Sequence, residues 1–303
     1  MSERTPEQIA EELLAKAGLS GGDSGGKANG GGGDNIPVIR TAASLRDKVF
    51  EPLKYIVPGY LVEGATIFAG APKIGKSWLM LDVGLAVSRG GECLGGIKCE
   101  EGDVLYLAYE DNERRLQSRT TKLIGYAKEW PERFDYATEW PRAHAGGLEH
   151  IRNWIASKNK PRLIVIDVLA RFRSPRQRHQ DPYEADYAAI SELQTITSKT
   201  GIAIVIVHHA RKSPAEVDPF ERISGTTGQT GGADTGLVLD RDGQGVTLYG
   251  RGRDIEEFEV AAEFVDRCRW RVLGPAADVR RSDERGAILS FLIGSPTSWP
   301  PLA

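Results

Sequence analysis

The types and spacing of eight residues, from Gly70 to Ser77, predict a phosphate-binding loop. The stretch reads Gly-x-x-x-x-Gly-Lys-Ser. Its two glycines let the backbone curl so that successive N–H groups point at phosphate oxygens, and Lys76 can reach the β- and γ-phosphates. The Ser77 hydroxyl can ligate Mg²⁺. We therefore expect ATP and Mg²⁺ to bind at Gly70, Ala71, Pro72, Lys73, Ile74, Gly75, Lys76, Ser77 and Trp78.

The segments that flank this loop favour a functional motif over a chance glycine-rich turn. A phosphate-binding loop needs a strand before it and a helix after it. Residues 65–69 are a short apolar run bounded by turn formers, and residues 77–88 have a helical pattern without proline. Both requirements are therefore met by the residues on either side of the motif.

An acidic residue at the end of a buried strand is expected to hold Mg²⁺ together with Ser77. The stretch LIVIDV places Asp167 after four apolar residues, which favours this role over that of an ordinary loop aspartate. Val168 and Leu169 follow, where many ATPases have the glutamate that activates water. The general base is therefore expected elsewhere in the chain.

The stretch LYLAYED ends a different strand with Glu110 and Asp111. Because the carboxyl ends of parallel strands meet at one edge of a sheet, these acids should lie near the phosphate loop. We predict that Glu110 polarises the attacking water. The alternative is that Glu110 caps the helix that starts at Asn112, but Asp111 fits that cap better.

A fourth strand ends with the pair His208 and His209. A histidine at this edge could hydrogen-bond the γ-phosphate or its water and report hydrolysis to the next loop. One of the two is expected to be a core histidine whose hydrogen bonds are satisfied. The sequence alone does not decide which one acts as the sensor.

The elements expected to position these residues follow an α/β order. Continuous apolar runs, typical of parallel strands buried on both faces, occupy 65–70, 103–109, 162–169 and 202–209. Helical patterns lie between them at 76–88, 112–129, 147–157 and 184–200. Closely spaced amphipathic runs at 235–240, 245–250, 256–265 and 269–274 indicate antiparallel strands. We predict a three-layer α/β/α domain with a mostly parallel sheet and antiparallel C-terminal strands.

Four segments are expected along the chain. Residues 1–18 form a short helix whose start is marked by Thr5, Pro6 and Gln8, and residues 19–35 form a flexible linker rich in glycine. Residues 36–275 form the ATPase domain. Residues 276–303 begin like the first helix of a winged helix and then run out of chain, so we expect a truncated, vestigial tail.

Composition narrows the class of protein further. The chain has 303 residues and a formal net charge of −3, so any contact with nucleic acid must come from a local basic patch. Its three cysteines have no metal-ligand spacing and suit a reducing cytosol. The first residues lack the layout of a signal peptide, and no apolar run is long enough to span a bilayer. We therefore expect a cytoplasmic protein without membrane contact.

Five stretches together resemble the RecA-like ATPases of the RepA type, which are hexameric replicative helicases of plasmids with phage and prophage relatives. They read GAPKIGKSWLMLDVGLAVSRG, VLYLAYEDNERRLQSR, LIVIDVLARFR, VHHARKS and ISGTTGQTGGADTGLVLDR. The resemblance extends over residues 57–273. It implies a RecA-like fold, a homo-hexameric ring with ATP at subunit interfaces, and single-stranded DNA in the central pore.

The resemblance also implies roles for individual residues. Lys76 and Ser77 bind ATP and Mg²⁺, Glu110 is the catalytic glutamate and Asp167 the Walker B acid. His208 and His209 form the sensor pair. In such enzymes an arginine from the neighbouring subunit completes the site.

Arg251 and Arg253 are the candidates for that arginine. They follow a predicted strand, and their i, i+2 spacing aims both side chains the same way. RecA-like helicases often use two basic residues at this spacing. The alternative is a solvated hairpin tip, because Asp254 could pair with an arginine locally.

Two loops are candidates for contact with DNA. The loop after Asp167 carries arginines without an acid, and the loop at 224–232 is rich in glycine and hydroxyl groups. Such loops line the pore in RecA-like rings, and both kinds of side chain can make sequence-independent phosphate contacts. The candidate DNA contacts are Arg171, Arg173, Arg176, Arg178, Thr226, Thr227 and Gln229. A solvated charged surface is the alternative for the arginines.

Taken together, these patterns predict a ring-forming ATPase that is stimulated by single-stranded DNA and acts as a helicase in replication of a phage or mobile element. A loader or recombination mediator with the same ATP site, which would not translocate, is the first alternative. A P-loop kinase of small molecules is a further one, although only the stretch ARFRSPRQR resembles the arginine-bearing lid that such a kinase needs.

Overall fold

The computed structural model describes residues 39–125, 128–175, 182–209, 218–223, 232–265, 268–283 and 285. The chain divides into two compact units, Met1–Glu51 and Pro52–Ala303. In the first, the described residues form one short helix, α2 (Ala42–Arg46), which is capped by the Thr41 side chain. The predicted segments at 1–18 and 19–35 lie outside the described residues. The second unit begins at Pro52, later than the domain start expected at residue 36.

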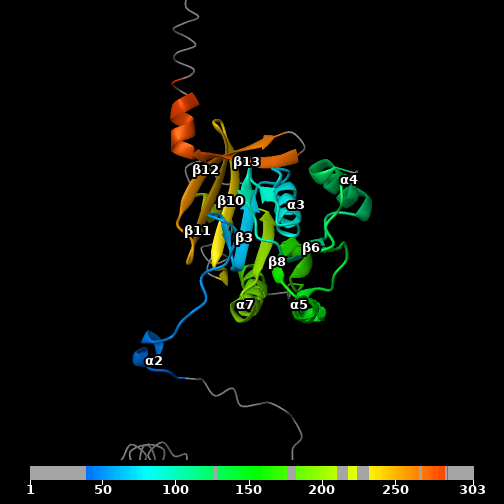
Figure 1. The fold of residues 1–303 in the computed structure, drawn as a ribbon, viewed down its shortest axis with the longest axis vertical. Coiled ribbons are helices and arrows are strands. Elements are labelled where there is room, and N and C mark those ends of the chain that lie inside the picture. The colour runs from blue at the N-terminus through cyan, green and yellow to red at the C-terminus, as the bar shows by residue number, and fades with distance from the viewer. Residues whose placement is uncertain are drawn as a thin grey trace, which may run out of the picture. The chain divides into compact units, whose positions relative to one another are not determined.

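A nine-stranded sheet forms the centre of the second unit, in the order β13-β12-β11-β10-β3-β9-β8-β6-β7 (Figure 1). The strands from β10 to β7 are parallel to one another, and β11, β12 and β13 extend the sheet in antiparallel fashion. Their bounds are β3 Gly64–Gly70, β6 Asp103–Ala108, β7 Phe134–Ala137, β8 Pro161–Asp167, β9 Ala203–His209, β10 Thr235–Asp242, β11 Gly245–Gly252, β12 Phe258–Val265 and β13 Arg269–Pro275. This is the predicted mostly parallel sheet with antiparallel C-terminal strands.

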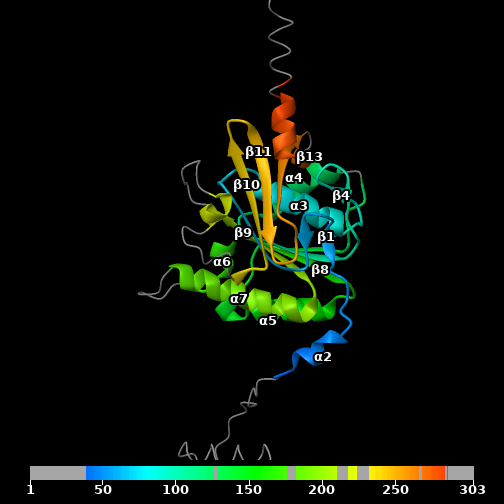
Figure 2. The same cartoon turned by 90° about the vertical axis from the view of Figure 1, so that its left-hand side faces the viewer.

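Helices cover both faces of the sheet and make the three layers visible in Figure 2. One hydrophobic cluster joins the sheet to α3 and α4, and a second joins its other face to α5 and α7. The helices are α3 Lys76–Val87, α4 Glu113–Ile124, α5 Gly147–Ser157, α6 Leu169–Phe172 and α7 Pro182–Thr200, with short 3₁₀ turns η1 at Ala143–Ala145 and η2 at Pro219–Ile223; residues 276–283 are also helical. Among the described residues, no helix has the length and apolar character needed to cross a membrane.

The central strands are apolar throughout because both of their faces are covered. On β9, Val205 and Val207 pack in the cluster with α3, whereas Ile204 and Ile206 pack in the cluster with α7. Side chains on a strand point alternately to the two faces, so a strand between two helical layers needs apolar residues at consecutive positions. The continuous apolar runs in the sequence therefore predicted these strands correctly.

Strand β10 differs from the expectation for residues 235–240. It pairs in parallel with β3 and antiparallel with β11, so it belongs to the parallel core and only its second edge begins the antiparallel part. Its first five residues are buried, like those of the other core strands. Helix α4 also ends earlier than expected, at Ile124, because Gly125 follows with a positive φ of 89°.

Short elements without a periodic pattern were not expected from the sequence. They are the edge strand β7 and two small hairpins, β1 (Tyr55–Val57) with β2 (Leu61–Val62) and β4 (Glu92–Cys93) with β5 (Ile97–Lys98). Strands of two to four residues are too short for an alternating pattern to be recognised.

Strand β13 returns over helix α3 and is joined to it by a buried ion pair. The Nε atom of Arg269 lies 3.4 Å from Oδ1 of Asp82 on α3, and another nitrogen of the same guanidinium donates to the carbonyl oxygen of Leu123 on α4. Oδ2 of Asp82 has no hydrogen-bond partner among the described residues. Burial therefore raises the pKa of Asp82 from 3.8 to about 6, although Arg269 and Arg89 oppose this shift.

This pKa predicts a pH dependence of stability that one substitution should remove. Between pH 3.8 and about 6 the folded protein binds more protons at Asp82 than the unfolded chain does, so the free energy of unfolding falls as the pH rises. Relative to Asp82→Asn, the wild type should lose about 2 kcal/mol across this window. Urea denaturation of both proteins at pH 4 and pH 7 measures this difference. A difference that does not change with pH would contradict the prediction.

Candidate nucleotide-binding site

The phosphate loop connects the end of β3 at Gly70 to the start of α3 at Lys76, as the sequence predicts. Both of its glycines are required by the backbone. Gly75 has a φ of 112°, in the left-handed region, and caps the helix without a side-chain hydrogen bond. A Cβ atom at Gly70 would lie 2.6 Å from the carbonyl oxygen of Leu239 on β10. Any other residue at these positions would strain or displace the loop.

Lys76 lies at the centre of the site with its ammonium group almost fully buried. Its Nζ donates to the carbonyl oxygens of Gly70 (2.7 Å) and Ala71 (3.0 Å) and lies 3.5 Å from Nδ1 of His209. Burial lowers the pKa of Lys76 to about 8, while the negative charges of Asp167 and Glu110 act in the opposite direction. The loop and the end of β9 therefore hold a cation at the place where phosphate oxygens are expected.

Asp167 ends β8 and is 4% exposed. Its carboxylate accepts hydrogen bonds from the Tyr106 hydroxyl, at 2.8 Å, and from the Ser77 side chain. Burial raises the pKa of Asp167, and these two hydrogen bonds oppose the rise. The predicted pair of magnesium ligands, Ser77 and Asp167, is thus in direct contact.

Tyr106 is a residue of the site that the sequence analysis missed. Its hydroxyl also lies 3.4 Å from the carbonyl oxygen of Ser77, so one buried side chain contacts both the strand with the acid and the first turn of α3. Ala108 is the register partner of Asp167, and Tyr106 points to the same face two residues earlier. This strand register is the signal that could have identified Tyr106.

Glu110 and Asp111 follow β6 and have different environments. Oε1 of Glu110 is 3.5 Å from Nε2 of His209, and half of the Glu110 side chain is exposed. Asp111 is 5% exposed and pairs with Arg115 at 3.2 Å and Arg119 at 2.5 Å. Of the two acids, only Glu110 faces both solvent and the phosphate loop.

The helix cap expected at Asp111 is formed instead by the next residue. Asn112 is the N-cap of α4, and its side chain accepts a hydrogen bond from the backbone N–H of Arg115. Asp111 cannot fill this role because its carboxylate is held by two arginines. The correction leaves Glu110 free of any capping function.

Strand geometry separates the two histidines. His208 is the register partner of Ala69 and His209 that of Gly70, so consecutive residues of β9 point to opposite faces of the sheet. His209 points to the face with α3 and lies between Lys76 and Glu110. The structure therefore brings His209, rather than His208, to the phosphate loop.

Arg251 and Arg253 lie at the opposite edge of the sheet from the phosphate loop. Gly252 is paired through Thr235 with Thr66, four residues before Gly70, which corresponds to about 13 Å along the strand. Neither arginine can therefore reach the loop of its own chain without a large rearrangement.

The two arginines differ in how firmly they are held. Arg251 pairs with Asp218 at 2.8 Å and Glu257 at 2.6 Å and stacks on the ring of Phe220, and its carboxylate partners raise its pKa. Arg253 has one ion pair, with Asp234 at 3.5 Å, and 63% of its side chain is exposed. Arg253 is thus the more available of the two.

Few of the candidate DNA contacts fall on described residues. Arg171 is exposed on α6. Arg173 instead pairs with Asp186 of α7 at 3.0 Å and is largely covered, so it holds two helices together rather than facing solvent. Arg176, Arg178, Thr226, Thr227 and Gln229 lie outside the described residues.

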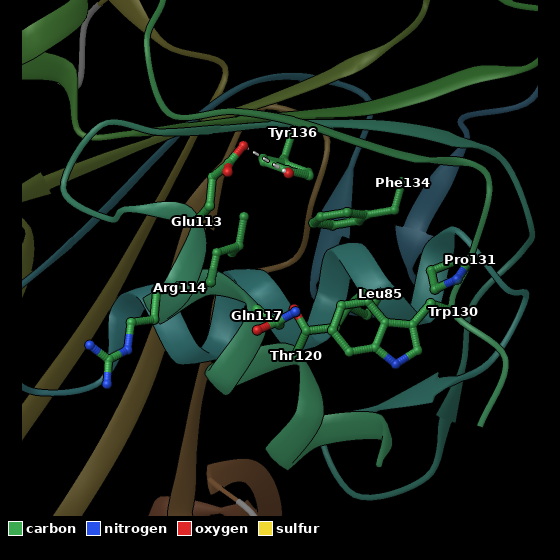
Figure 3. A pocket seen from close by; sticks show the side chains of 10 residues that line it. Leu85, Glu113, Arg114, Gln117, Thr120, Trp130, Pro131, Phe134 and Tyr136 are labelled. Atoms are coloured by element: carbon green, nitrogen blue, oxygen red, sulfur yellow. Dashed lines mark hydrogen bonds between the residues drawn. The ribbon is translucent and has the colours of Figure 1, made fainter. Parts of the chain in front are cut away.

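A pocket of about 500 Å³ lies beside α4, away from the residues discussed above (Figure 3). The side chains of Glu113 and Tyr136 are hydrogen-bonded in it at 3.2 Å. Its described lining consists of Leu85, Glu113, Arg114, Leu116, Gln117, Thr120, Trp130, Pro131, Phe134 and Tyr136. None of these is a residue of the phosphate loop, so we do not assign the pocket to the phosphates of the nucleotide.

Comparisons with known proteins agree with this fold and this loop. Residues 37–215, more than half of the chain, match a family model described as an AAA domain. A solved structure of an isolated ATPase domain superposes with a TM-score of 0.56 and 11% identity, over 70% of this chain and 85% of that one. A DnaB-like replicative helicase, solved in a study of its interactions with primase, superposes with a TM-score of 0.57 and 10% identity, over 88% of this chain and 71% of that one. With the phosphate loop, the acid on the adjoining strand and this fold in place, the chain belongs to the AAA domain family and is an ATPase with a RecA-like core.

Proposed function

We propose that this protein is a ring-forming motor that couples ATP hydrolysis to movement on single-stranded DNA. The observation that carries the proposal is the convergence of five side chains at the carboxyl edge of the parallel strands. Lys76 and Ser77 come from the loop after β3, Glu110 and Asp167 from the ends of β6 and β8, and His209 from the end of β9. Four separate segments thus place a cation, two acids, a hydroxyl and an imidazole around one loop.

Ser77 and Asp167 fit the requirements of Mg²⁺. They offer a hydroxyl and a carboxylate oxygen, and Mg²⁺ prefers hard oxygen ligands. A bound cation would also compensate the buried charge of Asp167, whose pKa is raised by burial. When bound, Mg²⁺ would neutralise charge on the β- and γ-phosphates.

Glu110 is the proposed general base. Its carboxylate would accept a proton from the water that attacks the γ-phosphate, while Lys76 compensates negative charge on the phosphate oxygens. His209 contacts both of these residues, so it would respond when the γ-phosphate leaves. This is the role of a sensor, and it falls to His209 because His208 points to the other face of the sheet.

Substitution of the two neighbouring acids separates their roles. Glu110→Gln should bind ATP normally but hydrolyse it about 10²–10⁴-fold more slowly, because the general base is lost. Asp111→Asn should keep most of the turnover and lower the melting temperature, because Arg115 and Arg119 lose a buried partner. Steady-state ATPase assays and thermal melts of both variants measure these effects. A crippled Asp111→Asn beside an active Glu110→Gln would mean that the wrong acid has been chosen.

The arginines support a ring because they lie at the wrong edge of their own chain to complete its site. An arginine that contacts the γ-phosphate must then come from a neighbouring copy. Arg253 is the better candidate, since it is more exposed and has fewer partners than Arg251. A homo-hexamer with ATP at its interfaces would satisfy this requirement.

Mixing two inactive variants tests whether the arginine acts across an interface. Arg253→Ala lacks the arginine and Lys76→Ala lacks the phosphate contact, but a mixed ring has some interfaces with both. Because such an arginine is typically worth about 10³–10⁵-fold in rate, even a minority of repaired interfaces should restore measurable ATPase activity.

Arg241→Ala serves as the control for this experiment, since Arg241 is exposed at the other end of the β10–β11 hairpin and should not affect turnover. Normal turnover in Arg253→Ala, or no recovery despite co-assembly shown by native mass spectrometry, would exclude the trans role.

DNA is the proposed track because exposed Arg171 follows closely on Asp167 and because the superposed proteins include a replicative helicase. Single-stranded DNA should stimulate the ATPase, and the protein should unwind a forked duplex in an ATP-dependent manner. Stimulation without unwinding would favour a loader or recombination mediator, the first alternative. Phosphate transfer to a small acceptor would favour a kinase and contradict the proposal.

A further inference from the structure

A tryptophan from the far edge of the sheet contacts the phosphate loop directly. The Nε1 atom of Trp270, on β13, donates a hydrogen bond of 3.1 Å to the carbonyl oxygen of Gly75. Its indole is 1% exposed, and the ring lies so close to Gly75 that an added Cβ atom would come within 2.9 Å of it. These residues are 195 positions apart in the chain.

We propose that Trp270 is a positioning residue that sets the orientation of the last peptide of the phosphate loop. The peptide between Gly75 and Lys76 is planar and trans, so its C=O and N–H groups point in opposite directions. Fixing the Gly75 oxygen against the indole therefore fixes the Lys76 N–H toward the interior of the loop, where phosphate oxygens are bound. The inference rests on the proposed binding of ATP at this loop.

The same carbonyl already accepts a helical hydrogen bond. The backbone N–H of Leu79 donates to the Gly75 oxygen at 3.1 Å, and the indole uses the second lone pair of that oxygen. Gly75 needs this support because it has a left-handed φ of 112° and no side chain with which to cap α3. The indole thus supplies from outside the helix a restraint that the loop lacks.

Trp270 is itself held on several sides. It is the cross-strand partner of Phe264, and the two rings make an edge contact with centroids 5.2 Å apart. Its neighbour Arg269 pairs with Asp82 on α3, and Val272 N–H donates to the carbonyl oxygen of Leu94 in the small hairpin. Strand β13 is therefore a rigid support for the indole, and a shift of the phosphate loop would be transmitted to this strand.

Trp270→Phe removes the donor and keeps an aromatic ring in the core. The Kd for the analogue AMP-PNP with Mg²⁺, measured by calorimetry, should rise about threefold to tenfold, the usual effect of losing one neutral hydrogen bond. In ATPase assays KM should rise while kcat stays close to the wild-type value, because Glu110 and Asp167 are unaffected. A purely structural role would instead lower the melting temperature and the active fraction and leave KM unchanged.

Trp140→Phe is the matched control, because Trp140 also donates to a backbone carbonyl, that of Gly147, at 3.1 Å. It should lose a comparable amount of stability without a change in Kd. Equal Kd values for wild type and Trp270→Phe would overturn the inference. If the wild type bound AMP-PNP no better than Lys76→Ala does, the proposed function would fail together with it.

Hydrogen–deuterium exchange of the wild-type protein tests the inference without a substitution. Binding of AMP-PNP should slow exchange in a peptide covering residues 268–275, while a peptide covering β7 should exchange as before. Bound nucleotide with unchanged exchange at 268–275 would contradict the coupling, even if Trp270→Phe failed to fold.

Discussion

The register of the parallel strands is the constraint on which the site depends. Gly70 is paired with His209, and Ala108 with Asp167, so the ends of four neighbouring strands stop at nearly the same level. Each chain segment that continues beyond this level enters the space above the phosphate loop. A slip of one residue in any of these pairings would turn the functional side chain to the opposite face of the sheet.

Burial of charge at this edge explains why the register must be held firmly. Lys76 and Asp167 are both almost fully buried, and an unpaired buried charge is costly. Hydrogen bonds to the carbonyls of the loop satisfy the ammonium, and Tyr106 with Ser77 satisfies the carboxylate. The pKa values of both groups are shifted by burial toward the neutral form, which is the state that a ligand of opposite charge would reverse.

The antiparallel extension supports the site and also carries residues away from it. Through β10 it is hydrogen-bonded to β3, and through Trp270 on β13 it contacts the phosphate loop at the carboxyl edge. Its β11 strand ends at the other edge, with Arg251 and Arg253. One sheet thus presents a phosphate-binding edge and an arginine-bearing edge, an arrangement that suits copies placed edge to edge.

The sequence by itself determined the elements whose pattern is long enough to recognise. The phosphate loop, the four core strands and the helices after them follow from local periodicity and turn chemistry, and Lys76, Ser77 and Asp167 were identified from motif spacing. The tertiary structure alone decided which member of each ambiguous pair faces the loop. His209 rather than His208 does so because of strand alternation, and Glu110 rather than Asp111 because two arginines hold Asp111. Tyr106, Trp270 and the salt bridge of Arg173 came only from the structure, since their partners are distant in sequence and no local pattern encodes such contacts.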